Sequence, residues 1–241
     1  MSPIAINNIL FLDIETVPQF PTFKDLPEDW KTHWQKKSDN LLKYHEDETT
    51  ETIYQRAGIY AEFGKIVCIS CGIVSGSGKE KKITIKSFNG ADEVKLLNEF
   101  IAMLQKWSAS GNKFLCAHNG KEFDFPFLCR RMIINNIGIP PILNIAGKKP
   151  WEISHLDTME LWKFGDYKSY TSLILLAHIF GIPTPKDDID GSMVANVFWK
   201  EKNIERIVHY CQKDVITLTQ IYLKMYAEDL ITENNIEIKP A

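Results

Sequence analysis

Short apolar runs alternate with amphipathic stretches along most of the chain, and this alternation predicts the secondary structure. Residues 8–14 are rich in Ile and Leu, which is typical of a strand in the interior of a sheet. Residues 64–74 and 81–88 are two further apolar segments, and the Gly- and Ser-containing turn at 75–78 predicts that they form a hairpin. Two shorter apolar segments predict a strand at 113–117 and an edge strand at 153–156.

The clearest helical pattern covers residues 92–107. Val94, Leu97, Ile101 and Leu104 recur at helical spacing, and Asp92 with Glu93 would lie at the positive end of the helix dipole. Further helices are predicted at 123–136, 171–180 and 203–226.

Residues 19–62 differ from the rest, because charged residues and scattered aromatic residues replace the regular pattern. Trp30 and Trp34 fall on one face of a possible helix, so we interpret this segment as a partly helical insertion. Residues 1–232 are predicted to form a single domain, followed by a loosely ordered tail at 233–241. The order of strands and helices predicts an α/β fold with a mixed sheet.

Composition restricts the class of protein. The chain has 241 residues, of which 44% are apolar and 24% charged, as expected for a globular protein with its own core. A net charge of −3 argues against binding nucleic acid through a strongly basic surface. The sequence lacks the apolar run of roughly 18 residues that a membrane span needs, and its start does not resemble a secretory signal. We therefore expect no membrane association and a cytoplasmic location.

Cys68 and Cys71 have the spacing of half a zinc site, but they fall within a predicted strand. A separation of three residues places them on opposite faces of that strand, and no second pair follows. We therefore expect two small buried side chains at these positions.

Asp13 and Glu15 are two positions apart on the first predicted strand, so both side chains point to one face. Two carboxylates among large apolar residues would pay a desolvation cost and repel each other. A divalent cation bound through oxygen atoms would remove both costs. The alternative is that the strand ends there and both acids meet solvent or an arginine.

Asp124 lies where a predicted strand gives way to a helix, and Tyr210 and Asp214 share one face of the last helix at i and i+4. Taken singly, Asp124 could cap its helix, and Asp214 could be a surface residue beside a partly buried tyrosine. An Asp-x-Glu strand, a central Asp and a final Tyr-x-x-x-Asp helix follow one another along the chain. In this order they indicate one shared functional site more strongly than any of them does alone.

In these three segments (residues 11–16, 119–124 and 210–214) the chain resembles the DEDD superfamily of 3′→5′ exonucleases, in the branch that has tyrosine in its third motif. It is most similar to stand-alone bacterial exonucleases related to the proofreading domain of family-B DNA polymerases. The resemblance covers nearly the whole chain outside the insertion. It implies an RNase H-like fold with a mixed five-stranded sheet flanked by helices, in a free-standing nuclease.

The resemblance also implies a reaction, which is hydrolysis of phosphodiester bonds from the 3′ end of nucleic acid with two Mg²⁺ or Mn²⁺ ions. DNA, in single-stranded form, is the favoured substrate. Asp13 would bridge the ions, Glu15 and Asp214 would hold the ion that activates water, and Asp124 would hold the second. Tyr210 would orient the water, and the candidate substrate contacts are Thr16, Asn119 and Phe123.

Several alternatives remain open from the sequence. His209 fits the His-x-x-x-x-Asp spacing of a sister branch, although adjacent residues diverge by about 100° around a helix, which favours Tyr210. The substrate could be RNA, because that choice depends on contacts to the 2′-hydroxyl. An RNase H-like endonuclease and a catalytically silent nucleic-acid-binding protein are further possibilities. Phe125, Trp162 and Tyr170 could stack on bases, but a position in the core is the more common explanation for each such residue.

Overall fold

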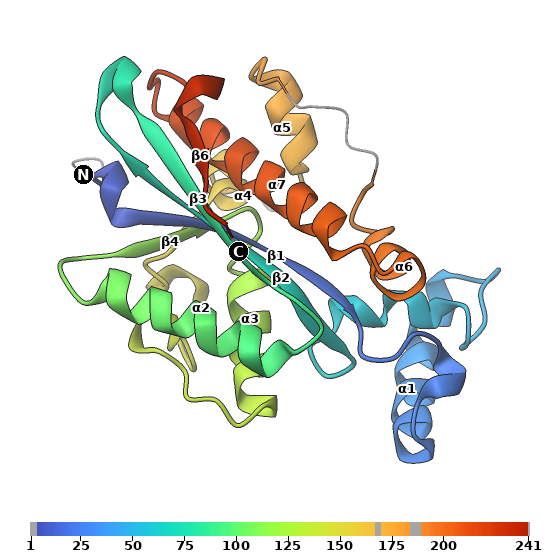
Figure 1. Ribbon diagram of the computed structural model, residues 1–241. Helices are drawn as coiled ribbons and strands as arrows, with labels where there is room; N and C mark the ends of the chain where they lie inside the picture. The colour runs from blue at the N-terminus through green and yellow to red at the C-terminus, as the bar shows by residue number, and fades with distance from the viewer. Residues whose placement is uncertain (1–3, 167–169, 184–188, 241) are drawn as a thin grey trace.

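A six-stranded mixed sheet forms the centre of the protein, in the order β5-β4-β1-β2-β3-β6 (Figure 1). The structure is a computed structural model and describes residues 4–166, 170–183 and 189–240. The strands are β1 (Ile9–Pro18), β2 (Gly64–Ser75), β3 (Lys82–Asn89), β4 (Phe114–Ala117), β5 (Leu156–Asp157) and β6 (Ile236–Ile238). The α/β class with a mixed sheet is therefore confirmed.

β1 lies in the interior of the sheet and pairs on both sides. It runs antiparallel to β2 and parallel to β4, which explains why its residues are apolar on both faces. Its register against β2 shifts between Glu15 and Thr16. Such a bulge bends a strand and redirects its side chains, and it falls at the first candidate motif.

Helices cover both faces of the sheet (Figure 1). On one face, α2 (Glu93–Ser108) and α3 (Asp124–Ile134) pack on Leu10, Leu12 and Ile14. On the other face, α7 (Ile204–Met225) packs on Ile9 and Phe11. Asp13 and Glu15 follow the alternation of Ile9 and Phe11, so they face α7.

The long helix α7 approaches the sheet closely at Gly72. A Cβ atom added to Gly72 would lie 2.9 Å from side-chain atoms of both Val215 and Ile83. Glycine at this position therefore allows α7 to lie against β2, next to the strand that carries the first candidate motif. Shorter helices complete this side of the molecule: α4 (Thr158–Lys163), α5 (Leu173–Ile179) and α6 (Val194–Asn196).

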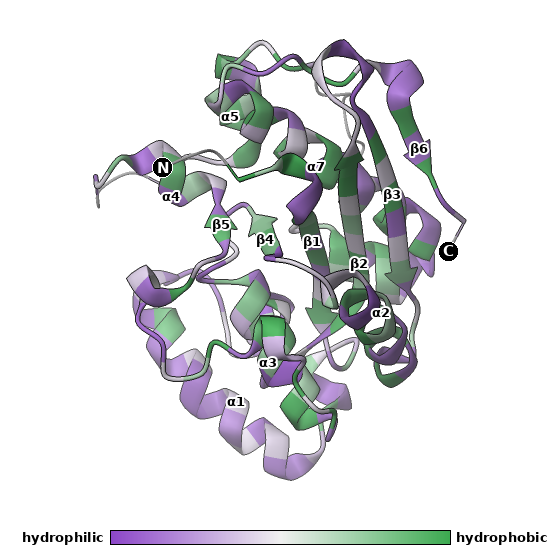
Figure 2. Cartoon of the chain, turned by 90° about the vertical axis from the view of Figure 1, so that its left-hand side faces the viewer, coloured by the Kyte–Doolittle hydropathy of each residue, from purple (hydrophilic) through white to green (hydrophobic). Residues whose placement is uncertain are grey.

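The cysteines of β2 lie on opposite faces, as the strand spacing predicts. Cys68 belongs to the apolar cluster beneath α7, whereas Cys71 belongs to the cluster beneath α2 and α3. Figure 2 shows that β2 is hydrophobic over most of its length, whereas α1 (Glu28–Leu41) is largely hydrophilic.

The segment between β1 and β2 is helical in part and has its own small core. It contains α1 and the short helix η4 (Ile53–Ile59). Trp34 and Tyr54 are fully buried there with their rings 5.2 Å apart, and the indole N–H of Trp34 donates to the carbonyl of Thr50. The segment is therefore an ordered attachment to the sheet.

The predicted loose tail is wrong for residues 236–238, and so is the predicted count of five strands. Residues Ile236–Ile238 form β6, which pairs in parallel with β3 from Ile83 to Ile85. β3 would otherwise present an unpaired edge, and the tail satisfies its backbone groups. Three residues are too few for alternation to reveal a strand in the sequence.

A buried ion pair joins α2, α3, β2 and the end of the insertion. Arg131 donates through Nε to Glu93 Oε1 (2.9 Å) and through Nη2 to Oε2 (2.5 Å), and its Nη1 donates to the carbonyl of Ala61 (2.8 Å). Glu93 also accepts the backbone N–H of Ile66 at 2.7 Å. Both charged groups are less than a tenth exposed, so each depends on the other for its solvation.

Replacing Arg131 by leucine should destabilise the protein by about 3–5 kcal/mol, because Glu93 would remain buried without its partner. The neighbouring Arg130 is exposed, and Arg130→Leu should change the free energy of unfolding by no more than about 0.5 kcal/mol. Urea denaturation of both variants measures the difference. Equal stability of the two variants would contradict this role of the ion pair.

Candidate active site

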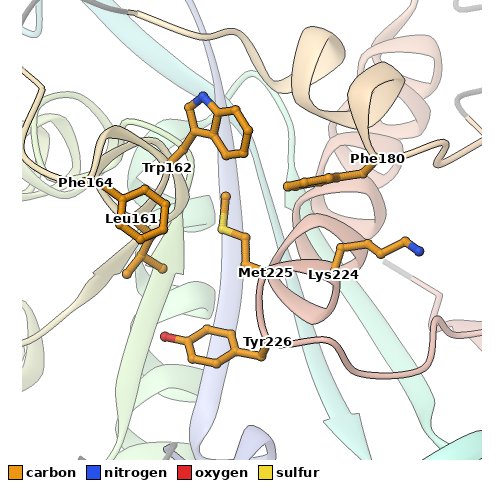
Figure 3. Close-up of a pocket in the computed structure, with 7 residues that line it drawn as sticks. All are labelled: Leu161, Trp162, Phe164, Phe180, Lys224, Met225 and Tyr226. Atoms are coloured by element: carbon orange, nitrogen blue, oxygen red, sulfur yellow. The ribbon is translucent and has the colours of Figure 1, made fainter.

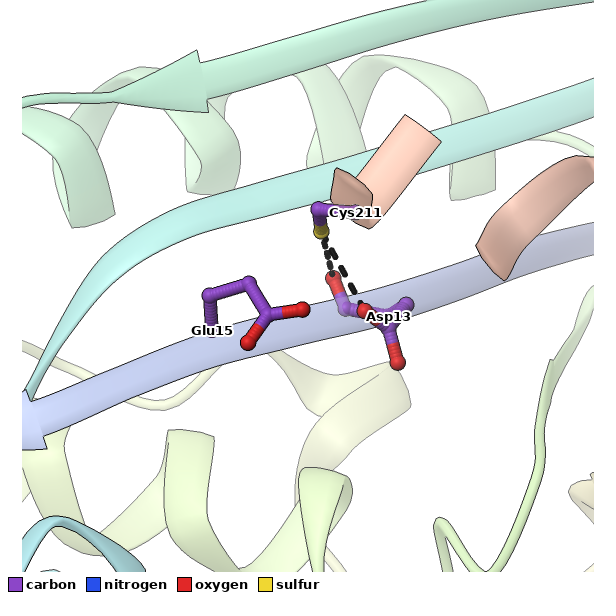
Figure 4. Close-up of side chains that lie close together, drawn as sticks. All are labelled: Asp13, Glu15 and Cys211. Atoms are coloured by element: carbon purple, nitrogen blue, oxygen red, sulfur yellow. Dashed lines mark hydrogen bonds between the residues drawn. The ribbon is translucent and has the colours of Figure 1, made fainter. Parts of the chain in front are cut away.

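Asp13 and Glu15 lie side by side on β1 and face α7 (Figure 4). One potential ligand atom from each of Asp13, Glu15 and Cys211 lies within 4.8 Å of the other two. Glu15 is 7% exposed, and Asp13 is partly buried. The two acids of the first motif therefore share one site with little exposure to solvent, and no arginine of the described residues is among the groups that shift their pKa values.

Tyr210 and Asp214 reach the same site from α7. The pKa of the Tyr210 hydroxyl is raised by burial and then by the charges of Asp214, Glu15 and Asp13, and Tyr210 is hydrogen-bonded to Asp214. His209 is exposed on the neighbouring face of the helix. The structure therefore brings Tyr210, and not His209, to the carboxylates.

Asp124 completes the group from a third element. It is the first residue of α3, and the N-cap position of that helix is taken by Phe123. Its side chain is 4% exposed. Burial raises the pKa of Asp124 to about 7, although hydrogen bonds from its own backbone and from that of Ile14 oppose the shift.

The four carboxylates affect one another electrostatically. Burial raises the pKa of Asp13 well above its ordinary value, and the charges of Asp214 and Asp124 raise it further. Burial, followed by the charges of Asp13 and Asp214, likewise raises the pKa of Glu15 well above its ordinary value. A cluster of like charges in a poorly solvated site favours a bound cation, and carboxylate oxygens are the ligands that Mg²⁺ and Mn²⁺ prefer. The donor set thus fits divalent ions.

Cys211 is a neighbour of the site that the sequence did not indicate. Burial, followed by a hydrogen bond with Cys68, raises the pKa of its thiol, so the group stays protonated and can donate. Its Sγ lies 3.2 Å from Oδ2 and 3.4 Å from the backbone oxygen of Asp13. Its position three residues before Asp214 on one helix face was the available signal.

Asp157 organises the loop that leads into Asp124, and sequence reasoning missed it. Its carboxylate accepts the backbone N–H groups of Asn119 (2.9 Å) and Lys121 (3.0 Å). It also caps α4 by accepting from Met159 at 2.9 Å. An aspartate immediately before a helix is a recognisable cap, but its contact with a distant loop is visible only in the fold.

The three candidate substrate contacts separate into two groups. Thr16 and Phe123 line a cavity of about 230 Å³ that also includes Glu15. Asn119 is not among the residues that line it. Its backbone has a φ of 63°, and its N–H is bound by Asp157, so the structure gives Asn119 a role in the shape of the loop.

A second cavity, of about 350 Å³, lies between α4, α5 and the end of α7 (Figure 3). It is lined by Leu161, Trp162, Phe164, Phe180, Lys224, Met225 and Tyr226. None of these lining residues is an acid, and the cavity is separate from the carboxylates. Trp162 therefore lies away from the candidate site, in edge contact with Phe180.

Comparison with known proteins identifies the class. The sequence model of a family described as a predicted 3′-5′ exonuclease related to the exonuclease domain of PolB matches residues 59–237. The chain belongs to this family. The matched residues include Asp124, Tyr210 and Asp214, whereas Asp13 and Glu15 precede them. No curated protein matches the chain.

Among solved structures, the chain is similar to the family B DNA polymerase from the hyperthermophilic archaeon Pyrobaculum calidifontis. The TM-score is 0.53 at 12% sequence identity, and the match covers 91% of this chain and 24% of the polymerase chain. The chain thus corresponds to about a quarter of that polymerase. The likeness confirms the predicted RNase H-like fold. Within the described ranges, no helix combines the length and apolar character required to cross a membrane.

The raised pKa values predict how stability depends on pH when metal is absent. Burial raises the pKa of Asp124 to about 7 in the folded chain, above its ordinary value of about 3.9, so between these pH values the folded state binds more protons than the unfolded state. With EDTA present, stability should therefore fall as the pH rises from about 4 to about 7. Asp124→Asn should flatten this dependence and stabilise the metal-free protein at pH 8, by an amount on the order of a few kcal/mol.

Denaturation in urea at several pH values, with EDTA, measures this effect. Asp229→Asn is the control, because Asp229 is an exposed aspartate outside the site. A metal-free Asp124→Asn variant less stable than the wild type at pH 8 would be inconsistent with a strained acid cluster.

Proposed function

We propose that this protein is a 3′→5′ exonuclease that removes nucleotides from the 3′ end of single-stranded DNA with two divalent metal ions. One observation carries the proposal: Asp13 and Glu15 lie together on β1, and the charges of Asp124 on α3 and Asp214 on α7, far away in the sequence, raise the pKa values of both. Membership of a family of predicted 3′-5′ exonucleases supports it.

Each residue has a proposed place in the reaction. Asp13 would be a ligand of both ions, Glu15 and Asp214 would hold one, and Asp124 would hold the other. Bound Mg²⁺ or Mn²⁺ supplies a water of lowered pKa and stabilises negative charge on the leaving oxygen. Cys211 restrains one oxygen of Asp13 through its thiol, leaving the second oxygen available.

Tyr210 would act as a hydrogen-bonding group and not as a base. Its pKa is raised by burial and by the neighbouring carboxylates, so its hydroxyl stays protonated at neutral pH. A protonated phenol that donates to Asp214 can accept a hydrogen bond from the attacking water and so orient it. The lowering of the pKa of water is left to the metal ions.

Asp13→Asn should lower the rate of hydrolysis by about 1,000-fold or more, because a carboxylate shared by both ions contributes several kcal/mol to the transition state. The assay uses 5′-labelled DNA and RNA oligonucleotides with Mg²⁺, Mn²⁺ or EDTA, and Asp229→Asn as control. Products that shorten stepwise from the 3′ end are expected only when metal is present. The polymer that is degraded faster, DNA or RNA, identifies the substrate. Normal turnover by Asp13→Asn, or cleavage of a closed circular strand, would refute the proposal.

Tyr210→Phe should lower kcat by about 100-fold with little change in KM, because the hydroxyl is needed in the transition state. His209→Ala should stay within about twofold of the wild type, since His209 is exposed. Steady-state kinetics on one oligonucleotide compares the two variants directly. A larger loss in His209→Ala would assign the protein to the histidine branch.

A further inference from the structure

An exposed phenylalanine at the end of α4 has an unfavourable backbone conformation. Phe164 has a φ of 45° and a ψ of 34°, in the left-handed region, and its side chain is 92% exposed. Glycine or asparagine adopts this conformation more readily than a bulky residue does. Exposure of a large aromatic ring to water is unfavourable as well. Neither feature stabilises the fold, and contact of the ring with a ligand would account for both.

Phe164 lies at the cavity of about 350 Å³ between α4, α5 and the end of α7 (Figure 3). Three further aromatic side chains line this cavity: Trp162, Phe180 and Tyr226. Trp162 and Phe180 hold each other in edge contact, with their ring centroids 5.6 Å apart. Among the described lining residues only Lys224 is charged, and it is exposed. The cavity therefore combines aromatic walls with a single cation.

Tyr170 connects this region to the loop that leads into Asp124. Its hydroxyl donates to Oε2 of Glu122 at 3.1 Å, and its ring is 66% exposed. The ammonium group of Lys163 lies over that ring, 4.2 Å from its centroid. Because Lys163 directly precedes Phe164, the exposed rings of Tyr170 and Phe164 follow each other from the edge of the candidate active site toward the cavity.

The two lysines of this region are available to an anion. Within the described parts of the chain, neither Lys163 nor Lys224 forms an ion pair with a carboxylate. The acids nearby in the sequence, Glu122, Glu160 and Asp166, each interact with another group of the protein. The region therefore offers positive charge in a protein whose net charge is −3.

Exposed aromatic rings that alternate with lysines suit a single strand of nucleic acid. Every base has an apolar face that can stack on an aromatic ring, and lysines bind the phosphates of the backbone. A purely apolar ligand would leave both lysines without a function. Because the protein as a whole is acidic, its affinity for a strand has to come from local features of this kind.

We propose that Tyr170, Phe164 and the cavity that contains Lys224 form a distal site, which binds the substrate strand several nucleotides upstream of its 3′ end. A strand whose 3′ end lies at the carboxylates can pass Tyr170 and reach Phe164. The inference rests on the proposed function and adds a dependence of affinity on strand length. The distal site lies outside the carboxylate cluster and takes no part in hydrolysis.

Binding of 5′-fluorescein-labelled dT12 and dT3, followed by fluorescence anisotropy with EDTA present to keep the strands intact, tests the distal site. Phe164→Asn removes the ring but keeps a residue that tolerates the left-handed conformation. It should reduce the advantage of dT12 over dT3 by about 10-fold, which corresponds to the loss of one stacked base. Tyr44→Asn is the matched control, because Tyr44 is an 84% exposed aromatic residue of the insertion, and it should keep the wild-type advantage within about twofold.

Kinetics with metal should agree with the binding measurement. Phe164→Asn should raise KM for dT12 by about 10-fold with little change in kcat, because the distal contact is equal in the ground and transition states.

Lys224→Ala tests the charge of the site separately. The slope of log K against log salt concentration for dT12 should become shallower by about 0.7, the value for one phosphate contact on a single strand. Lys106→Ala is the control, since Lys106 is exposed on α2 over the opposite face of the sheet, and it should keep the wild-type slope. Both lysines are exposed, so neither substitution disturbs the core.

The outcomes separate the two proposals. A wild-type protein that shortens DNA with metal, together with Phe164→Asn and Lys224→Ala variants that keep its length dependence and its salt slope, would overturn the distal site and leave the exonuclease intact. A wild-type protein without metal-dependent shortening of DNA or RNA would overturn the exonuclease and the distal site together.

Discussion

Repulsion among buried carboxylates is the constraint around which this structure is arranged. Asp13 and Glu15 occupy an interior strand, where burial and the charges of Asp214 and Asp124 raise their pKa values. Such a site costs free energy in the absence of cations, so the surrounding fold must hold it together. β1 does so by pairing on both sides, and α7 does so by packing closely over Gly72.

The compensating interactions lie outside the carboxylate cluster. The Glu93–Arg131 pair ties α2 to α3, and therefore fixes the helix whose first residue is Asp124. Asp157 fixes the loop before that helix by accepting two of its N–H groups. These contacts connect elements that are distant in sequence, so the position of Asp124 is determined by the scaffold and not by local preference.

The sequence predicted those features that depend on local periodicity. Alternation along β1 placed Asp13 and Glu15 on one face of the strand. Helical spacing placed Tyr210 and Asp214 on one face of the last helix. The resemblance to exonucleases supplied the fold. Features that depend on tertiary contact were missed: Asp157 as a bridge between α4 and a loop, Cys211 as a donor to Asp13, and β6 as a partner of β3. The sequence pattern favoured Tyr210 over His209 as the residue near the carboxylates. The structure was needed to show how α7 is rotated about its axis, and hence that Tyr210 points inward and His209 outward.

The most direct test of the account is to locate the metal ions by anomalous diffraction from crystals soaked in Mn²⁺. The account predicts two Mn²⁺ ions roughly 3.5–4 Å apart, one of them within ligand distance of Asp13, Glu15 and Asp214 and both sharing Asp13. Crystals in which Mn²⁺ binds elsewhere, or leaves these carboxylates free at saturating concentration, would contradict it.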